Sequence, residues 1–361
     1  MKNLKIAPMK KHYNFLILLL IIPFLGFAND DGYSTKQKTI KKTYIVNSDA
    51  GIDIDNKYGN ISVTTWDEDK IDIEVIIKVS GSNEKWVNEK LNSINVDITA
   101  LKSMLTAITN IGSSSLKSMG SSNNFEINYT LKIPKNGTVK LNNKYGNITT
   151  GDLASTADIF CKYGKVNLGR LNGNTNTIHI EYCQNSSINY IKNGNIEARY
   201  SGLKINSAGK INLDTNYTDI VMGDSQNIKY DCNYGTFKFQ KMGSVAGAGN
   251  YLTVNIGEIS NMLSVDLNYG NLAVGIINEK ANNINVTSGY SDVSLGYDSN
   301  YAFDFDISTR YSGLKTDSSM QISNSEEKSN AKKVSGFYKK KGQNKLVLTS
   351  NYGSILLVKK Q

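Results

Sequence analysis

The chain has 361 residues, with 41 Lys and Arg against 32 Asp and Glu, and it combines 21 Tyr and 30 Gly with only 3 Pro. This composition is typical of proteins that are rich in strands and turns and poor in helices. The basic residues are scattered, apart from a cluster at 332–342 that reads most simply as a solvated hairpin, so we expect no nucleic-acid partner.

The N-terminus has the features of a secretory signal peptide. Lys10 and Lys11 precede an apolar run that ends in Gly26-Phe27-Ala28. The run is shorter than the ~20 residues of a membrane-spanning helix, so we expect residues 1–28 to be removed and no transmembrane segment to remain. An uncleaved anchor is the alternative. The expected location is the periplasm or the cell surface of a Gram-negative bacterium.

Residues 29–124 are predicted to form an N-terminal β-rich cap. Alternating apolar residues indicate strands up to Gly81, and one short helix follows, with Ser82 as the candidate N-cap. The Ser- and Gly-rich stretch at 110–124 predicts a mobile loop.

A repeat built on tyrosine occupies the rest of the chain. The sequence Lys-Tyr-Gly-Asn-Ile occurs at 57–61 and again at 144–148, and tyrosines then recur every 17 to 21 residues. In nearly every copy a small residue follows the tyrosine and an apolar residue stands three positions after it. The regular repeat tyrosines are Tyr145, Tyr163, Tyr182, Tyr200, Tyr217, Tyr234, Tyr251, Tyr269, Tyr290 and Tyr311. Tyr58 and Tyr352 carry the same local pattern.

Each copy reads as two short alternating strands separated by a break at the small residue and followed by a glycine turn. Such a unit is too short for a βαβ crossover but matches one coil of a β-solenoid, in which stacked coils bury a shared interior. We therefore predict an all-β fold with a single-stack β-solenoid over 125–361. A right-handed β-helix is favoured because the six-residue period of left-handed helices is absent. An exposed excursion is expected at 318–336, and the residues around Tyr352 should close the stack.

The sequence offers no catalytic, cofactor-binding or metal-binding constellation, so we expect no enzyme and no cofactor. His179 is expected on the coil surface as a solvated imidazole. Asp219 and Asp292 share one repeat position, but four coils separate them by ~19 Å, more than glycosidase carboxylates tolerate.

The three cysteines are predicted to be free thiols. Cys161 and Cys232 share a repeat position four coils apart, and Cys183 should lie ~10 Å from Cys161, beyond the reach of a disulfide.

Two surface features could carry binding. The residue before each tyrosine is never apolar, so alternation places it outside, and a row forms from Asn216, Asn233, Asn250 and Asn268. A structural ladder of amides is the simpler interpretation of this row, and a surface for glycans or anionic envelope polymers is the alternative. Strict alternation points the tyrosines inward as a buried ladder, whereas the alternative exposes them as a stripe suited to sugar rings.

The units "YGNISVTTWDEDKIDIEVII" at 58–77 and "YTLKIPKNGTVKLNNKYGNI" at 129–148 resemble a bacterial family of candidate adhesins, which are domains of unknown function, and the related head-GIN auto-transporter adhesins. The likeness covers about 43–358. It implies an exported β-solenoid and supplies no established catalytic or binding residues. Tyrosine stands where many members have serine or another small polar residue.

The functional hypothesis is an exported, non-enzymatic, adhesin-like interaction or scaffold module of the cell envelope, whose partner would be a glycan or another envelope protein. The alternative is a carbohydrate-binding or carbohydrate-active β-helix, although an enzyme would need long loops bearing carboxylates, which the repeats at 145–275 lack. An envelope-stress sensor is a third possibility that the sequence neither supports nor contradicts.

Overall fold

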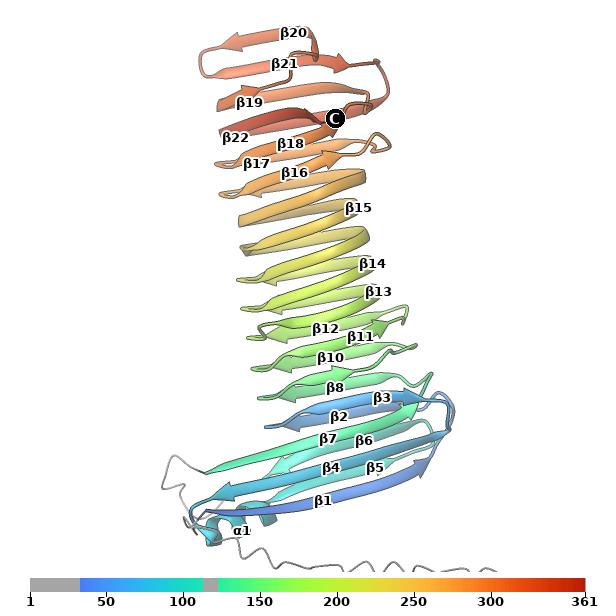
Figure 1. The fold of residues 1–361 in the computed structure, drawn as a ribbon. Helices are drawn as coiled ribbons and strands as arrows, with labels where there is room; N and C mark the ends of the chain where they lie inside the picture. Colours follow the sequence, from blue (N-terminus) through green and yellow to red (C-terminus); the bar gives the residue numbers. More distant parts are fainter. Residues whose placement is uncertain (1–32, 113–122, 361) are drawn as a thin grey trace, which may run out of the picture.

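The computed structural model describes residues 33–112 and 123–360, so the signal peptide and most of the loop predicted at 110–124 lie outside the described residues. The described chain has one helix, α1 (Glu84–Ser93), and its strands join one mixed sheet of 22 strands (Figure 1). The prediction of an all-β fold is confirmed.

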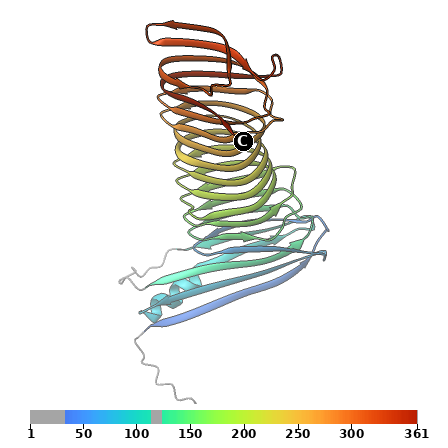
Figure 2. The same cartoon turned by 45° about the horizontal axis from the view of Figure 1, so that its top comes forward.

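Strands of successive repeats pair in parallel, each residue lying opposite a partner 17 to 21 positions further along the chain. The turns lie above one another in Figures 1 and 2, and each adds one strand spacing of about 4.8 Å. β15 runs through two tyrosine corners without a break. The strands of this region are β8 (Val139–Lys144), β9 (Ile148–Thr150), β10 (Ala157–Lys162), β11 (Val166–Leu171), β12 (Asn176–Glu181), β13 (Ser186–Arg199), β14 (Gly202–Asn216), β15 (Asp219–Asn268), β16 (Asn271–Ile277), β17 (Ile284–Gly289) and β18 (Asp292–Asp298).

The interior is filled by the same positions of every copy. In the copy around Tyr163, the buried residues include Ile159 and Cys161 before the corner and Val166 and Leu168 after it. The register places Ile159 between Leu141 below and Ile178 above. Because each side chain is covered by its equivalents in adjacent turns, no copy can bury its apolar residues alone.

The N-terminal end is a layer of antiparallel strands beneath the repeats. β1 (Ser34–Ile45) pairs with β4 (Lys70–Gly81), β4 pairs with β7 (Asn124–Pro134), and β5 (Ile94–Ala100) pairs with β6 (Met104–Ile111). β2 (Gly51–Lys57) and β3 (Ile61–Trp66) lie between this layer and β8 and β9. The two nearly identical motifs are therefore neighbours in space, although 87 residues separate Tyr58 from Tyr145 in the sequence.

The helix begins one residue later than the sequence analysis expected. Its N-cap is Asn83, not Ser82, and the Asn83 side chain accepts a hydrogen bond from the Trp86 backbone N–H. Trp86 and Val87 are the buried residues of the helix, and they face the antiparallel strands.

The C-terminal strand enters the stack instead of closing it. β22 (Asn344–Lys360) pairs in parallel with β17 and β18 on one edge and with β19 (Phe303–Lys315) on the other. The expectation that the turn around Tyr352 is the last is therefore wrong. The segment predicted as an excursion forms most of a hairpin, β20 (Gln321–Lys328) and β21 (Ala331–Tyr338), whose inner strand pairs with β19.

A buried polar network joins the N-terminal layer to the repeats. The Thr109 hydroxyl donates to Asn56 Oδ1 at 3.0 Å and lies 2.7 Å from the Tyr129 hydroxyl. Asn56 Nδ2 in turn lies 3.3 Å from Asn143 Oδ1, and Asn143 Nδ2 donates to the Gly59 carbonyl at 2.8 Å. The paired amides explain why the first two copies carry Asn where later copies carry smaller or apolar residues.

Tyr129 makes this junction sensitive to alkaline pH. Burial raises the pKa of Tyr129 to about 12, from an ordinary value of 10.0. The folded pKa lies above the unfolded one, so this contribution to stability is complete below pH 10 and is lost as the pH rises from 10 through 12.

We therefore expect Tyr129→Phe to flatten the decline of the denaturation midpoint between pH 10 and 12, at a cost of about 1 kcal/mol near neutral pH for the lost hydrogen bond. Urea denaturation followed by circular dichroism at stepped pH is the measurement. An alkaline decline as steep in the variant as in the parent chain would contradict this assignment.

Candidate functional site

The repeat tyrosines form one continuous stack, which we call the tyrosine column. Neighbouring ring centroids lie 4.5 to 5.1 Å apart, and the ring planes differ by 2 to 16°. In spatial order the column contains Tyr58, Tyr145, Tyr163, Tyr182, Tyr200, Tyr217, Tyr234, Tyr251, Tyr269, Tyr290, Tyr352 and Tyr311.

The column lies on the outside, so the prediction of an inward ladder is wrong. Every column tyrosine is 39 to 53% exposed. Each has a φ angle between 49 and 60°, in the left-handed region that bulky residues rarely adopt. The chain turns at this residue, and inside–outside alternation therefore does not continue through it. The inward prediction assumed an extended tyrosine.

Backbone contacts between turns explain the tyrosine–small pair. The N–H of Tyr163 donates to the Glu181 carbonyl at 3.0 Å, and most of the column repeats this bond. The next residue is pressed against the turn below: a Cβ at Gly164 would lie 2.0 Å from the Gly146 carbonyl oxygen. Other copies use Ser or Thr here, and the Ser201 hydroxyl donates back to the Arg199 carbonyl at 2.8 Å.

The stacking decides what the column can offer a ligand. Each inner ring has both faces covered by its neighbours, so a sugar ring cannot stack on those faces. The ring edges and the phenol groups remain accessible. At the lower end Tyr58 has Phe125 on its other side, with the centroids 5.0 Å apart. The column is therefore an aromatic edge, not a set of separate sugar platforms.

A polar row runs beside the column. We define it as the residues that precede the column tyrosines: Lys57, Lys144, Lys162, Glu181, Arg199, Asn216, Asn233, Asn250, Asn268, Gly289, Asn351 and Arg310. Of the four predicted row residues, Asn250 and Asn268 are exposed, and Asn216 and Asn233 are half-buried. Asn250 Nδ2 donates to Asn233 Oδ1 at 3.1 Å, so these two amides do form a rung of a ladder.

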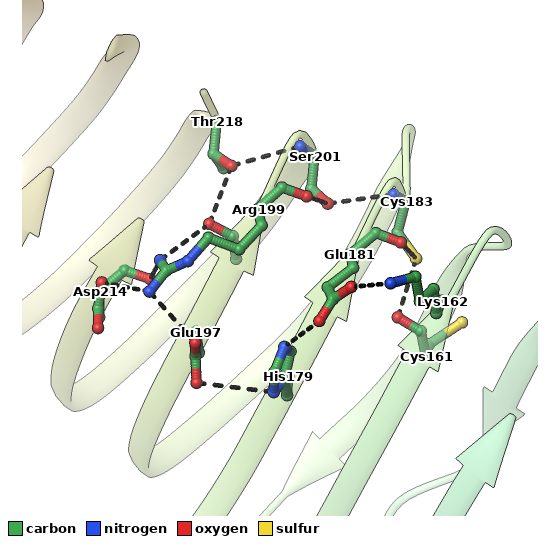
Figure 3. A network of polar contacts seen from close by, with 11 residues as sticks. Cys161, Lys162, His179, Glu181, Cys183, Glu197, Arg199, Ser201, Asp214 and Thr218 are labelled. Carbon is green, nitrogen blue, oxygen red and sulfur yellow. Dashed lines mark hydrogen bonds and ion pairs between the residues drawn. The ribbon is translucent and has the colours of Figure 1, made fainter. Parts of the chain in front are cut away.

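Three consecutive members of the polar row, Lys162, Glu181 and Arg199, take part in ion pairs (Figure 3). Lys162 Nζ lies 2.5 Å from Glu181 Oε2, and the Glu181 Oε1 atom lies 3.0 Å from His179 Nε2. The hydrogen bond from Lys162 holds the pKa of Glu181 below its usual range. His179 Nδ1 reaches Glu197 Oε2 at 3.6 Å. His179 is thus on the outer surface, as expected, but its ring is half-buried between two carboxylates.

Arg199 completes this network. Its Nη2 atom lies 2.9 Å from Asp214 Oδ1 and 3.2 Å from Glu197 Oε1. The side chains of this network therefore pair with one another, and none of its members is an isolated charge.

All three cysteines are free, as predicted, and the structure also buries them. The expected separation of Cys161 and Cys183 is wrong, however, because Cys183 Sγ donates to the Cys161 carbonyl at 3.3 Å. Figure 3 shows Cys183 close to Cys161 on the adjacent turn. The hydrogen bond to Cys183, together with burial, raises the pKa of the Cys161 thiol.

The two aspartates considered as a carboxylate pair have separate structural roles. Asp219 Oδ1 accepts a hydrogen bond from the Thr236 N–H at 2.9 Å, and Asp292 Oδ1 accepts one from the Ser354 hydroxyl at 2.6 Å. Each therefore links its own turn to the next. Among the described residues no group of His, Cys, Asp and Glu could hold a metal ion, and no described helix is long and apolar enough to span a membrane.

Two of the grooves on the surface of the described residues bear on ligand binding, and neither could be read from the sequence alone. A groove of about 560 Å³ lies over β12 to β15 at the start of the strands that lead to the corners. It is lined mainly by Asn174, Asn193, Asn195, Lys210, Asn212 and Lys229. A second groove, of about 400 Å³, lies beside the upper part of the tyrosine column.

Comparison with known proteins gives distant structural neighbours only. No family model matches the chain, and no curated protein matches its sequence. A candidate cell adhesion protein of Clostridium sporogenes is 9% identical with a TM-score of 0.18, over 90% of this chain and 100% of its own. Candidate adhesins of Parabacteroides distasonis and Bacteroides fragilis are 10% and 15% identical with TM-scores of 0.32 and 0.23, each over 89% of this chain and 97% of its own. These names agree with the resemblance seen in the sequence, but the similarity is too low to identify a ligand.

The column can be tested at Tyr200, whose ring lies between those of Tyr182 and Tyr217 at 4.9 and 5.0 Å. Tyr200→Ala removes both stacking contacts and keeps a side chain that disfavours positive φ, so we expect a loss of about 1–3 kcal/mol in unfolding free energy. Tyr200→Asn removes the same ring but tolerates the left-handed region, and should lose less. Denaturant midpoints give the ranking, and equal or reversed stabilities would refute the strained corner.

The small residue can be tested within one pair of turns. Gly164→Ala places a methyl group against the Gly146 carbonyl and should cost about 1–3 kcal/mol, the usual penalty for overpacking. Gly151→Ala is the matched control, since a Cβ there meets nothing within 4 Å. Thermal denaturation of the two variants should separate them clearly. If both are equally stable, the contact between turns does not select glycine.

Proposed function

We propose that the chain is an exported, non-enzymatic β-solenoid that acts as an adhesin-like interaction or scaffold module in the periplasm or on the cell surface. The register supports the solenoid, because each repeat adds one turn in parallel pairing with the last. The right-handed coil remains a prediction from the sequence. The signal-peptide features of residues 10–28 support export.

The observation that carries this proposal is the tyrosine column with its polar row. Together they repeat one arrangement of aromatic edge, phenol and polar side chain at every turn. A surface of this kind fits a long partner that lies along the stack better than it fits a small substrate enclosed in a pocket.

The non-enzymatic part of the proposal is supported by how the ionisable groups are used. His179 lies between two carboxylates, and Asp219 and Asp292 bond to neighbouring turns. These are interactions within the stack, and they leave no paired acid and base aimed at a common point.

Carbohydrate binding is the second candidate, and the groove of about 560 Å³ favours it. Asparagine amides line this groove, and amides both donate to and accept from sugar hydroxyls. The Asn212 Nδ2 atom donates to Asn195 Oδ1 at 2.8 Å, which fixes two of them in place. A glycan or another envelope protein is the partner that we propose.

The test compares binding of the purified chain from residue 29 to isolated cell-envelope fractions and to a glycan array. A variant with Tyr182, Tyr200 and Tyr217 replaced by Asn interrupts the column with a residue that accepts positive φ. We expect this variant to lose most of the binding.

The matched control replaces the exposed residues Lys204, Val221 and Lys238 by Thr on the strands that follow the corners. It should bind as the parent chain does. Equal binding by all three proteins would contradict a role for the column, and turnover of a bound glycan would contradict the non-enzymatic proposal.

A further inference from the structure

The polar row is interrupted once, at Gly289, and a groove of about 400 Å³ opens there beside the column. We call this groove the glycine notch. Asn268 lies below it and Asn351 and Arg310 line it from above, while the edges of Tyr269, Tyr290 and Tyr352 line its other side. The insertion of β22 creates this order, since it places Asn351 between Gly289 and Arg310.

Arg310 differs from the other arginine of the row. Arg199 contacts two carboxylates, whereas in the described parts of the chain no carboxylate lies within ion-pairing distance of Arg310. The Arg310 guanidinium is exposed and lies 5.6 Å from the centroid of the Tyr311 ring, which holds it against the column by a cation–π contact. It therefore presents an unpaired cation on an ordered support.

The floor of the glycine notch is an amide. Asn268 Oδ1 lies 2.3 Å from the point where a Cβ of residue 289 would stand, so the amide turns toward the space that the glycine leaves open. Asn351 is exposed on the other side of the gap. The notch thus combines amide donors and acceptors with one free guanidinium and with phenol edges.

We propose that the glycine notch binds a carboxylate-bearing sugar residue of an acidic polysaccharide that lies along the tyrosine column. The proposal rests on the proposed binding role of the column and adds the ligand class. A guanidinium pairs with a carboxylate through two parallel hydrogen bonds, and the amides of Asn268 and Asn351 suit the hydroxyls of the same sugar. The covered ring faces favour a polymer held by its polar groups over one held by stacking.

The probe is a hexamer of galacturonic acid, and the methyl-esterified hexamer is its neutral counterpart with the same backbone. Titration calorimetry with the chain from residue 29 should show binding of the acid and at least tenfold weaker binding of the ester. Arg310→Gln should weaken binding of the acid by about tenfold or more, because a charge-assisted pair is lost. Gly289→Asn should have a similar effect, since it fills the notch with the residue that neighbouring turns carry at this position.

Two further variants test whether binding depends on the glycine notch in particular. Arg170→Gln removes an equal charge from an exposed arginine that stacks on Tyr190 at 4.3 Å, and Lys210→Gln removes a charge from the asparagine-lined groove. Arg170→Gln should bind the acidic hexamer as the parent chain does, whereas Lys210→Gln tests the asparagine-lined groove as the rival site for the acid. The proposal is overturned if the parent chain fails to bind the acid, if the ester binds equally well, or if Lys210→Gln rather than Arg310→Gln abolishes binding.

The glycan array distinguishes failure of the acidic-polysaccharide proposal from failure of the proposed binding function. If the parent chain binds neutral glycans or envelope fractions and the Tyr182, Tyr200 and Tyr217 variant does not, the proposed binding function stands and only the acidic ligand is refuted. Circular dichroism is the measurement that checks whether Gly289→Asn and Arg310→Gln are folded. Arg310→Gln leaves the backbone untouched and is decisive if Gly289→Asn is unstable.

Discussion

The structure depends on a left-handed residue at one corner of every turn. A side chain in this conformation destabilises the folded state by about 1–2 kcal/mol, and one stacked aromatic pair stabilises it by about 0.5–1.5 kcal/mol. These two contributions to the free energy roughly cancel. The balance becomes favourable only when a neighbour is present, because the ring contact, the tyrosine N–H bond and the shared interior all join one turn to the next. Stability is therefore a property of adjacent turns.

The same constraint decides which features the sequence could reveal. The period, the strand content and the need for a small residue after tyrosine all follow from patterns that repeat along the chain, and the structure has the strands and the close approach at Gly164. The direction of the tyrosines could not be read in this way. Alternation is a property of extended residues, and it fails at the tyrosine, the repeat position where φ is positive in every copy.

Contacts between distant segments were beyond sequence reasoning for a related reason. Cys161 and Cys183 approach because a corner displaces the chain sideways, and a distance counted along an ideal strand misses this. The glycine notch requires knowing that Asn351 lies above Gly289, which follows from strand insertion and not from chain order. The single signal in the sequence was the glycine itself, the one member of the polar row without a side chain.

The insertion of β22 also determines the order in which the strands can pair as the chain is synthesised. β19 and the hairpin above it are made before β22, yet the strand pairing that joins β19 to the lower turns runs through β22. In a chain that emerges from its N-terminus, the lower turns can pair in sequence, each on the one before. The turn that carries Tyr311 cannot pair with the lower turns until β22 has been made, and a chain cut short before Asn344 would leave two strand edges open to other molecules.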